Sequence, residues 1–144
     1  MTTTFDLDGL GALLDRLSEQ GYEVFGPTVR GGVIAPDALG SVGDLPVGWT
    51  DEQEGGRYRL VSRDDAARFG YAVGPQSWKE LLHPARSKVW DMERTADTGL
   101  TVRMHVPESQ KWAFVGVRPC ELAAIHKQDR VLLEGAHPDP TYGA

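Results

Sequence analysis

The stretch WAFVGVRPC at residues 112–120, followed by the segment 121–133, decides how the fold of this chain is interpreted. Residues 112–117 form an almost continuous apolar run, which is typical of an interior strand of a sheet. Pro119 suits the first turn of a helix, and residues 121–133 place leucine and isoleucine near one helical face. The stretch therefore predicts a strand, a short loop and a helix in that order.

Working outward, the N-terminal segment predicts a second helix over residues 5–19, where leucines recur at helical spacing. Asp6 or Asp8 could cap its start, because a side-chain oxygen there can accept a bond from a free N–H group of the first turn. Gly21 follows the predicted end, where a residue with positive φ is common.

Strands are predicted on either side of the turn Arg30-Gly31-Gly32, at residues 22–25 and 33–35, forming a hairpin. A third strand is predicted at residues 57–62, where apolar and charged side chains alternate. The segment 41–56 is rich in Gly, Pro and acidic residues and is expected to run over the surface.

The second half of the chain predicts a helix over residues 77–82, with Ser77 and Glu80 in the pattern of a capping box. A further helical turn is expected over residues 85–92. Residues 100–106 alternate apolar and polar side chains and predict a half-buried strand. The expected fold class is α/β in the α+β sense. We expect residues 1–144 to form one compact domain with a mixed sheet flanked by helices.

Composition excludes several classes of protein. The net charge of −6 does not favour nucleic acid as a partner, since binding phosphates requires clustered Lys and Arg. No stretch approaches the run of about 18 apolar residues that spans a membrane. The single cysteine rules out an internal disulfide, and the N-terminus lacks the pattern of a signal peptide. We expect a cytoplasmic protein.

The loop at Arg118 and Cys120 is the first candidate site, because ligands of open α/β sheets gather beyond the carboxyl ends of strands. A helix N-terminus and Arg118 would both favour a thiolate, the form of cysteine that binds iron or reacts. The alternative is that Cys120 is a small buried apolar residue. A catalytic cysteine or a zinc site is less favoured, because the histidines show no local signature; they are His83, His105, His126 and His137.

Several segments of the chain form a recognisable set. They are residues 26–29 (GPTV), 56–60 (GRYRL), 73–79 (VGPQSWK), 115–125 (VGVRPCELAAI), 129–131 (DRV) and 139–142 (DPTY). Together they resemble the 4Fe-4S dicluster proteins, the group of the sulfhydrogenase beta subunits and the anaerobic sulfite reductase A subunits. The resemblance extends over nearly the whole chain, with its motifs in the same order.

The resemblance implies an iron–sulfur electron-transfer subunit of a multi-subunit oxidoreductase, such as a hydrogenase or a sulfite reductase. Its partners would be a C-terminal ferredoxin-like region and other oxidoreductase subunits. A 4Fe-4S cluster normally takes four cysteine ligands, and this chain has one. We therefore expect a cluster-free N-terminal domain of a longer protein that docks and shields the redox site, without catalysis of its own and with no cofactor in residues 1–144.

In the full-length parent, Arg118 and Cys120 are the candidate residues at the cluster site, and Cys120 is a candidate iron ligand. Two alternatives stay open. The chain could be a stand-alone binding module without redox chemistry, or a cysteine-dependent enzyme.

Overall fold

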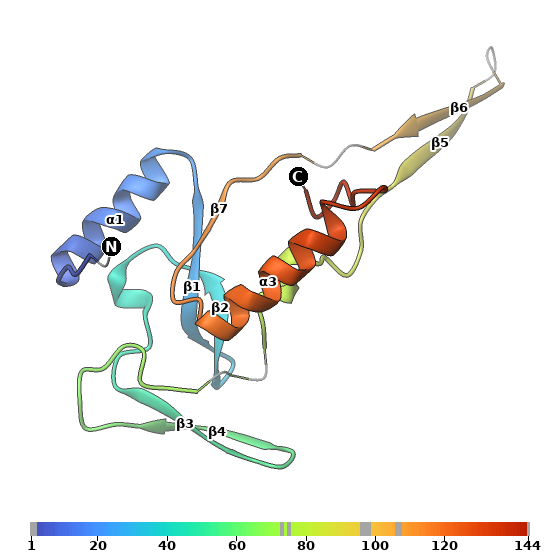
Figure 1. Cartoon of the computed structure of the whole chain (residues 1–144). Helices are drawn as coiled ribbons and strands as arrows, with labels where there is room; N and C mark the ends of the chain where they lie inside the picture. The colour runs from blue at the N-terminus through green and yellow to red at the C-terminus, as the bar shows by residue number, and fades with distance from the viewer. Residues whose placement is uncertain (1–2, 73, 75, 96–98, 106–107, 144) are drawn as a thin grey trace. The chain divides into compact units, whose positions relative to one another are not determined.

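The structure is a computed structural model that describes residues 3–72, 74, 76–95, 99–105 and 108–143 (Figure 1). Helices and strands are both present, and one sheet combines parallel and antiparallel pairing, so the predicted α+β class with a mixed sheet is confirmed. The chain divides into two compact units. The first comprises Met1–Trp78 and Gln110–Pro119, and the second comprises Lys79–Ser109 and Cys120–Ala144.

The first unit is built on a sheet of three strands in the order β2-β1-β7. β1 (Glu23–Arg30) lies in the middle, antiparallel to β2 (Val33–Ala38) and parallel to β7 (Trp112–Phe114). Val24 and Phe25 of β1 are buried. A central strand of a mixed sheet is covered on both faces, which explains its run of buried residues.

The hairpin of β1 and β2 confirms the predicted turn, and both strands are longer than predicted. Arg30 pairs with Val33, which leaves Gly31 and Gly32 as a two-residue loop. Their φ angles are 58° and 78°. Two successive positive φ angles define the turn that matches the twist of a hairpin, and glycine adopts them without strain.

Helix α1 (Leu7–Glu19) ends at the predicted residue and begins two residues later than predicted, after Asp6, which is one of the two candidate caps. The Asp6 carboxylate accepts a hydrogen bond from the Gly9 N–H at 2.9 Å, and Gly21 follows the helix with a φ of 80°. The helix contributes Leu14 to the core of this unit. That core also contains Val24, Leu39 and Leu45, all of them buried.

The prediction that residues 112–117 form an interior strand is wrong. β7 covers Trp112–Phe114 and pairs with β1 alone among the described strands, so it lies at the edge of the sheet. The Val115 N–H still donates to the Phe25 carbonyl at 2.8 Å. The next residue of β1 on this side is Pro27, which has no N–H group to continue the ladder. The apolar run is half-buried because side chains of the same unit cover it.

The expected surface segment 41–56 is also partly wrong. Its first residues form η1 (Val42–Asp44), a short 3-10 helix closed by a capping box of Ser41 and Asp44. Leu45 and Pro46, which follow, are buried. The Gly and Pro content of this segment therefore reflects a compact turn that enters the core rather than an exposed loop.

The rest of segment 41–56 belongs to a second hairpin, of β3 (Trp49–Glu54) and β4 (Arg57–Ser62). β4 has the predicted bounds. The Tyr58 hydroxyl of β4 accepts a hydrogen bond from the Ile34 N–H of β2 at 3.3 Å, which ties this hairpin to the three-stranded sheet.

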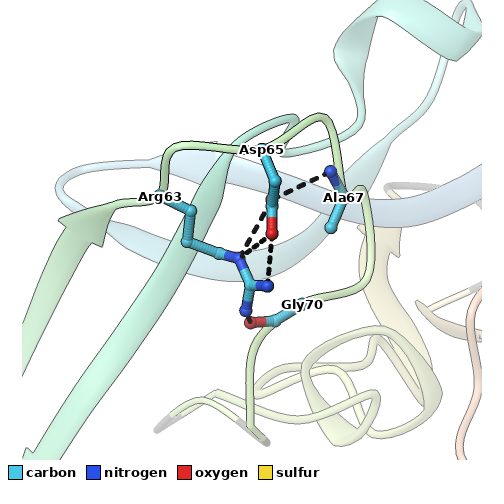
Figure 2. A network of polar contacts seen from close by, with 4 residues as sticks. All are labelled: Arg63, Asp65, Ala67 and Gly70. Carbon is cyan, nitrogen blue, oxygen red and sulfur yellow. Dashed lines mark hydrogen bonds and ion pairs between the residues drawn. The ribbon is translucent and has the colours of Figure 1, made fainter.

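A network of polar contacts holds the loop after β4 (Figure 2). The Arg63 guanidinium contacts both oxygens of Asp65 and donates to the Gly70 carbonyl at 3.1 Å, while Asp65 accepts from the Ala67 N–H at 3.1 Å. The hydrogen bond from Arg63 lowers the pKa of Asp65, and Asp65 raises the pKa of Arg63. Arg63 is engaged within its own loop, so its role is structural.

The second unit contains α2 (Lys79–Leu82), a sheet of β5 (Trp90–Thr95) and β6 (Gly99–Met104), and α3 (Pro119–Leu132) from Cys120 onward. The strand predicted at 100–106 is confirmed up to Met104, and residue 106 lies outside the described residues. The helical turn expected over 85–92 is wrong. Trp90 and Met92 instead pair with Met104 and Val102, so the partner strand decides their conformation.

The burial predicted for the 100–106 strand is not observed. Leu100, Val102 and Met104 each expose more than half of their surface. None of the helices that the structure describes has the length and apolar character needed to cross a bilayer.

Trp78 is the buried aromatic side chain at the end of the first segment of this unit. Its side chain is 5 % exposed, and its ring centroid lies 4.9 Å from that of Phe114 on β7. Tilted aromatic pairs at this separation add to the free energy gained from burial. The tryptophan thus covers the strand whose outer edge has no partner strand among the described residues.

We expect replacement of Trp78 by Ala to lower the free energy of unfolding by about 3–5 kcal/mol, because it leaves a cavity next to Phe114. Val29→Ala is the matched control, since Val29 lies on β1 of the same unit and is 43 % exposed; it should cost less than about 1 kcal/mol. Urea unfolding followed by tryptophan fluorescence and circular dichroism measures both. Equal losses for the two variants would contradict the anchor role.

Candidate functional site

Arg118 is positioned by the first unit. Its Nη2 atom donates to the carbonyl oxygen of Tyr71, and its guanidinium carbon lies 5.1 Å from the centroid of the Tyr71 ring. A guanidinium over an aromatic face is attracted by the ring quadrupole. Arg118 is half-buried, so the contact fixes the chain at the residue just before α3 begins.

Cys120 is the second residue of α3 and is exposed as a free thiol. The alternative that Cys120 is a small buried core residue is therefore wrong. Its backbone lies in the first turn of a 14-residue helix, where N–H groups have no partner within the helix. The structure thus places the thiol at the predicted helix start and within reach of solvent.

The histidines do not form a metal site with the cysteine. His83 Nε2 lies 2.9 Å from the Gln128 side-chain oxygen, and His126 Nδ1 lies 3.6 Å from Asp129. His105 and His137 are exposed. Across residues 3–72, 74, 76–95, 99–105 and 108–143, no three His, Cys, Asp or Glu side chains come together as a metal-binding group.

The segments 129–131 and 139–142 meet at the end of α3. The Tyr142 hydroxyl donates to Asp129 at 2.7 Å. Asp139 accepts from the N–H groups of Thr141 and Tyr142 at 2.8 and 3.1 Å, and its own N–H donates to the Leu132 carbonyl. We call this arrangement of Asp129, Asp139 and Tyr142 the C-terminal clasp, because it folds the chain back onto the helix.

The clasp keeps Tyr142 protonated. Burial and the hydrogen bond to Asp129 raise the pKa of Tyr142 to about 12. The ring also stacks on His83 with a centroid separation of 5.3 Å, beside a small hollow of about 140 Å³. A tyrosine that stays neutral donates one hydrogen bond and accepts others, so the clasp suits a structural role better than acid–base chemistry.

Two glycines within the segments that carry the resemblance are required by close approaches in the first unit. A Cβ on Gly74 would lie 2.6 Å from the carbonyl oxygen of Ile34, a backbone atom that cannot easily move. Gly116 has a φ of 80°, and a Cβ there would meet Phe69 and Pro27 at 3.0 and 3.3 Å. These glycines serve the packing of the sheet rather than a bound phosphate.

A hollow of about 490 Å³ in the first unit offers few groups that could bind or react with a small molecule. Its walls are polar and apolar in about equal measure, and they include Val29, Pro46 and Trp49. The carboxylate of Asp44 lines it but accepts bonds from the Gly40 and Ser41 N–H groups at 3.0 and 2.7 Å. The hollow therefore lacks an unengaged charged group to orient a small molecule.

Comparison with known proteins gives no independent assignment: no family model matches the chain, and no curated protein or solved structure matches it. The interpretation of the site therefore depends on its own geometry. Sequence reasoning identified Arg118 and Cys120 but missed Tyr71 as the partner of Arg118. It also missed the contact of Tyr142 with Asp129, although both residues lay in segments already singled out. A hydroxyl and a carboxylate 13 residues apart carry no local signal of pairing.

We expect Gly74→Ala to destabilise the protein by roughly 1–3 kcal/mol, because the added methyl forces the backbone near Ile34 to shift. Gly55→Ala is the control, since no atom lies within 4 Å of a Cβ at that position; it should change stability by less than about 0.5 kcal/mol. Thermal and urea unfolding of both variants measures the difference. A neutral Gly74→Ala would show that the approach to Ile34 is loose in solution.

The C-terminal clasp predicts that the stability of the folded protein falls at alkaline pH. Because the folded-state pKa of Tyr142 lies above the ordinary value of 10.0, folding favours the protonated hydroxyl. The stability it contributes is complete below about pH 10 and is lost as pH rises toward 12. A titration of tyrosinate absorbance should show one of the four tyrosines ionising near 12.

In that titration, Tyr142→Phe should remove the late step, and Asp129→Asn should move it to lower pH. Glu134→Gln, at an exposed position near the end of the same helix, should leave it unchanged. An identical late step in wild type and Tyr142→Phe would assign it to another tyrosine.

Proposed function

We propose that this chain is the cluster-free N-terminal domain of a cytoplasmic iron–sulfur electron-transfer subunit, which docks and shields a redox site that other parts complete. The observation that carries the proposal is the exposed Cys120 thiol at the start of α3, directly after an arginine held by Tyr71. The resemblance of residues 115–125 to the 4Fe-4S dicluster proteins adds the identity of the redox group.

The residues of this chain cannot supply all the ligands of a 4Fe-4S cluster. A 4Fe-4S cluster takes four cysteine thiolates, and the sequence contains one. Cys120 could supply a single ligand, or form part of the wall, in a site completed by another part of the protein. Arg118 would hold a positive charge near that site. In this role the domain binds and positions but does not catalyse.

The test uses the natural gene product, purified without oxygen. It should extend beyond Ala144 with C-x-x-C-x-x-C runs and should show the broad visible absorption of iron–sulfur clusters, whereas residues 1–144 alone should stay colourless after treatment with iron and sulfide. Cys120→Ser should lower the iron content if Cys120 is a ligand. If it is a wall residue, the same change should alter the electron paramagnetic resonance of the reduced cluster.

Ala123→Ser is the matched control, since Ala123 is also exposed on α3 and receives the same hydroxyl. It should leave iron content and resonance unchanged. A gene product without clusters, or a Cys120→Ser protein identical to wild type in both measurements, would overturn the proposal.

A second candidate function is a binding module without redox chemistry. It is favoured by the second unit, where Trp90, Met92, Leu100, Val102 and Met104 of β5 and β6 are all exposed. Exposed apolar patches on otherwise polar proteins usually mark surfaces that bind another molecule. This candidate depends on neither Cys120 nor a cluster.

A further inference from the structure

The sheet of β5 and β6 has one apolar and one charged face. Residues directly opposite each other in an antiparallel pair lie on the same face, and alternate residues of each strand share it. The pairs Trp90–Met104, Met92–Val102 and Arg94–Leu100 therefore occupy one face. We call it the ribbon face. It carries five apolar side chains and a single charge, that of Arg94.

The opposite face is charged and internally neutralised. Lys88 contacts Asp91 at 2.7 Å, and Arg103 contacts Glu93 at 3.4 Å. These ion pairs are well exposed, as expected of a face that remains in water. The charge pattern thus distinguishes the two faces, and the apolar one is the face available to a partner.

The ribbon face leaves a large apolar surface exposed. Its apolar side chains are 50–71 % exposed: Trp90, Met92, Leu100, Val102 and Met104. Together they offer on the order of 500 Å², near the upper end for the largest apolar patch on a monomer. Two-stranded sheets are marginally stable in water unless another layer covers them. The ribbon therefore gains stability from a covering surface.

We propose that the ribbon face binds the ribbon face of a second copy of this chain, which gives a symmetric dimer. Two such faces bury about 1,000 Å² in all, which is the lower limit for a specific interface. Stacked sheets lie about 10 Å apart, a separation that these long side chains can fill. Met92 and Met104 are flexible and adapt to the opposing surface.

The position of Arg94 selects one arrangement of the two copies. If the strands of one ribbon run parallel to the same strands of the other, the two Arg94 charges lie at the same end and repel. In the other arrangement β5 of one copy lies over β5 of the other and runs in the opposite direction. The two Arg94 side chains are then offset along the strands by the length of four residues, about 14 Å. Each arginine then lies over Trp90 of the other copy, where a guanidinium is favoured.

In this reversed arrangement the two-fold axis passes beside Met92, so Met92 of one copy faces Met92 of the other. The interface is isologous, as most homodimer interfaces are. The proposal is independent of iron–sulfur chemistry, and neither Arg118 nor Cys120 takes part in it. Its failure would therefore leave the proposed redox role untouched.

The first measurement is the mass of the wild-type protein in solution, by sedimentation at about 10 and 500 μM, since small interfaces reach micromolar affinity. We expect the dimer fraction to rise with concentration. Val102→Lys should shift the protein to monomer at both concentrations. Thr101→Lys is the control; it adds the same charge one residue away, on the opposite face beside Glu93, and should dimerise like wild type. Wild type that stays monomeric, or a dimer that Val102→Lys leaves intact, overturns the proposal.

A cross-link tests the arrangement in a Cys120→Ser background. Stacked sheets lie about 10 Å apart, which is too far for a direct disulfide, so the thiols are joined with a short bis-maleimide reagent. Met92→Cys should be cross-linked between two copies, because these residues face each other across the axis. Arg94→Cys should not, because its two copies lie about 14 Å apart. Circular dichroism confirms that each variant is folded. A cross-link at position 94, or none at position 92, would overturn the reversed arrangement.

Discussion

The sheet of the first unit depends on the backbone of β1, because a neighbouring strand is hydrogen-bonded to each of its two edges. One edge bonds to β2 in an antiparallel ladder, and the other bonds to β7 in a parallel one. Side chains of the same strand, Val24 and Phe25, enter the core against α1 and the aromatic rings of β7. A change that breaks β1 would therefore separate two segments that are more than 70 residues apart in sequence.

The segments that suggested a redox family turn out to act mainly through packing and turns. Pro27 ends the parallel ladder, Gly74 passes close to Ile34, and Trp78 covers Phe114. Near α3, Asp129 and Tyr142 form the C-terminal clasp. Cys120, in contrast, is an exposed free thiol at the start of α3.

Structural features that depend on neighbouring residues were predicted well from the sequence. The cap at Asp6, the glycine turn of the first hairpin and the bounds of β4 all depend on residues close together in the chain. Position in the sheet was not predictable from the apolar run at 112–117, because an edge strand covered by Trp78 is as apolar as a central one. The helical turn predicted over residues 85–92 was wrong for a related reason. The strand found there pairs with β6, and its partner residues are ten or more positions away in the sequence.

Pro36 has a consequence for how the protein behaves at high concentration. The Leu39 N–H donates to the Val24 carbonyl at 2.8 Å, so the odd-numbered residues of β2 face β1 and the nitrogen of Pro36 faces outward. An outer edge with a missing donor is a poor template for a strand from another molecule. Edge-to-edge growth, the first step of many β-aggregates, is thereby blocked at β2. The outer edge of β2 therefore offers an incoming strand one hydrogen-bond donor fewer than an edge without proline.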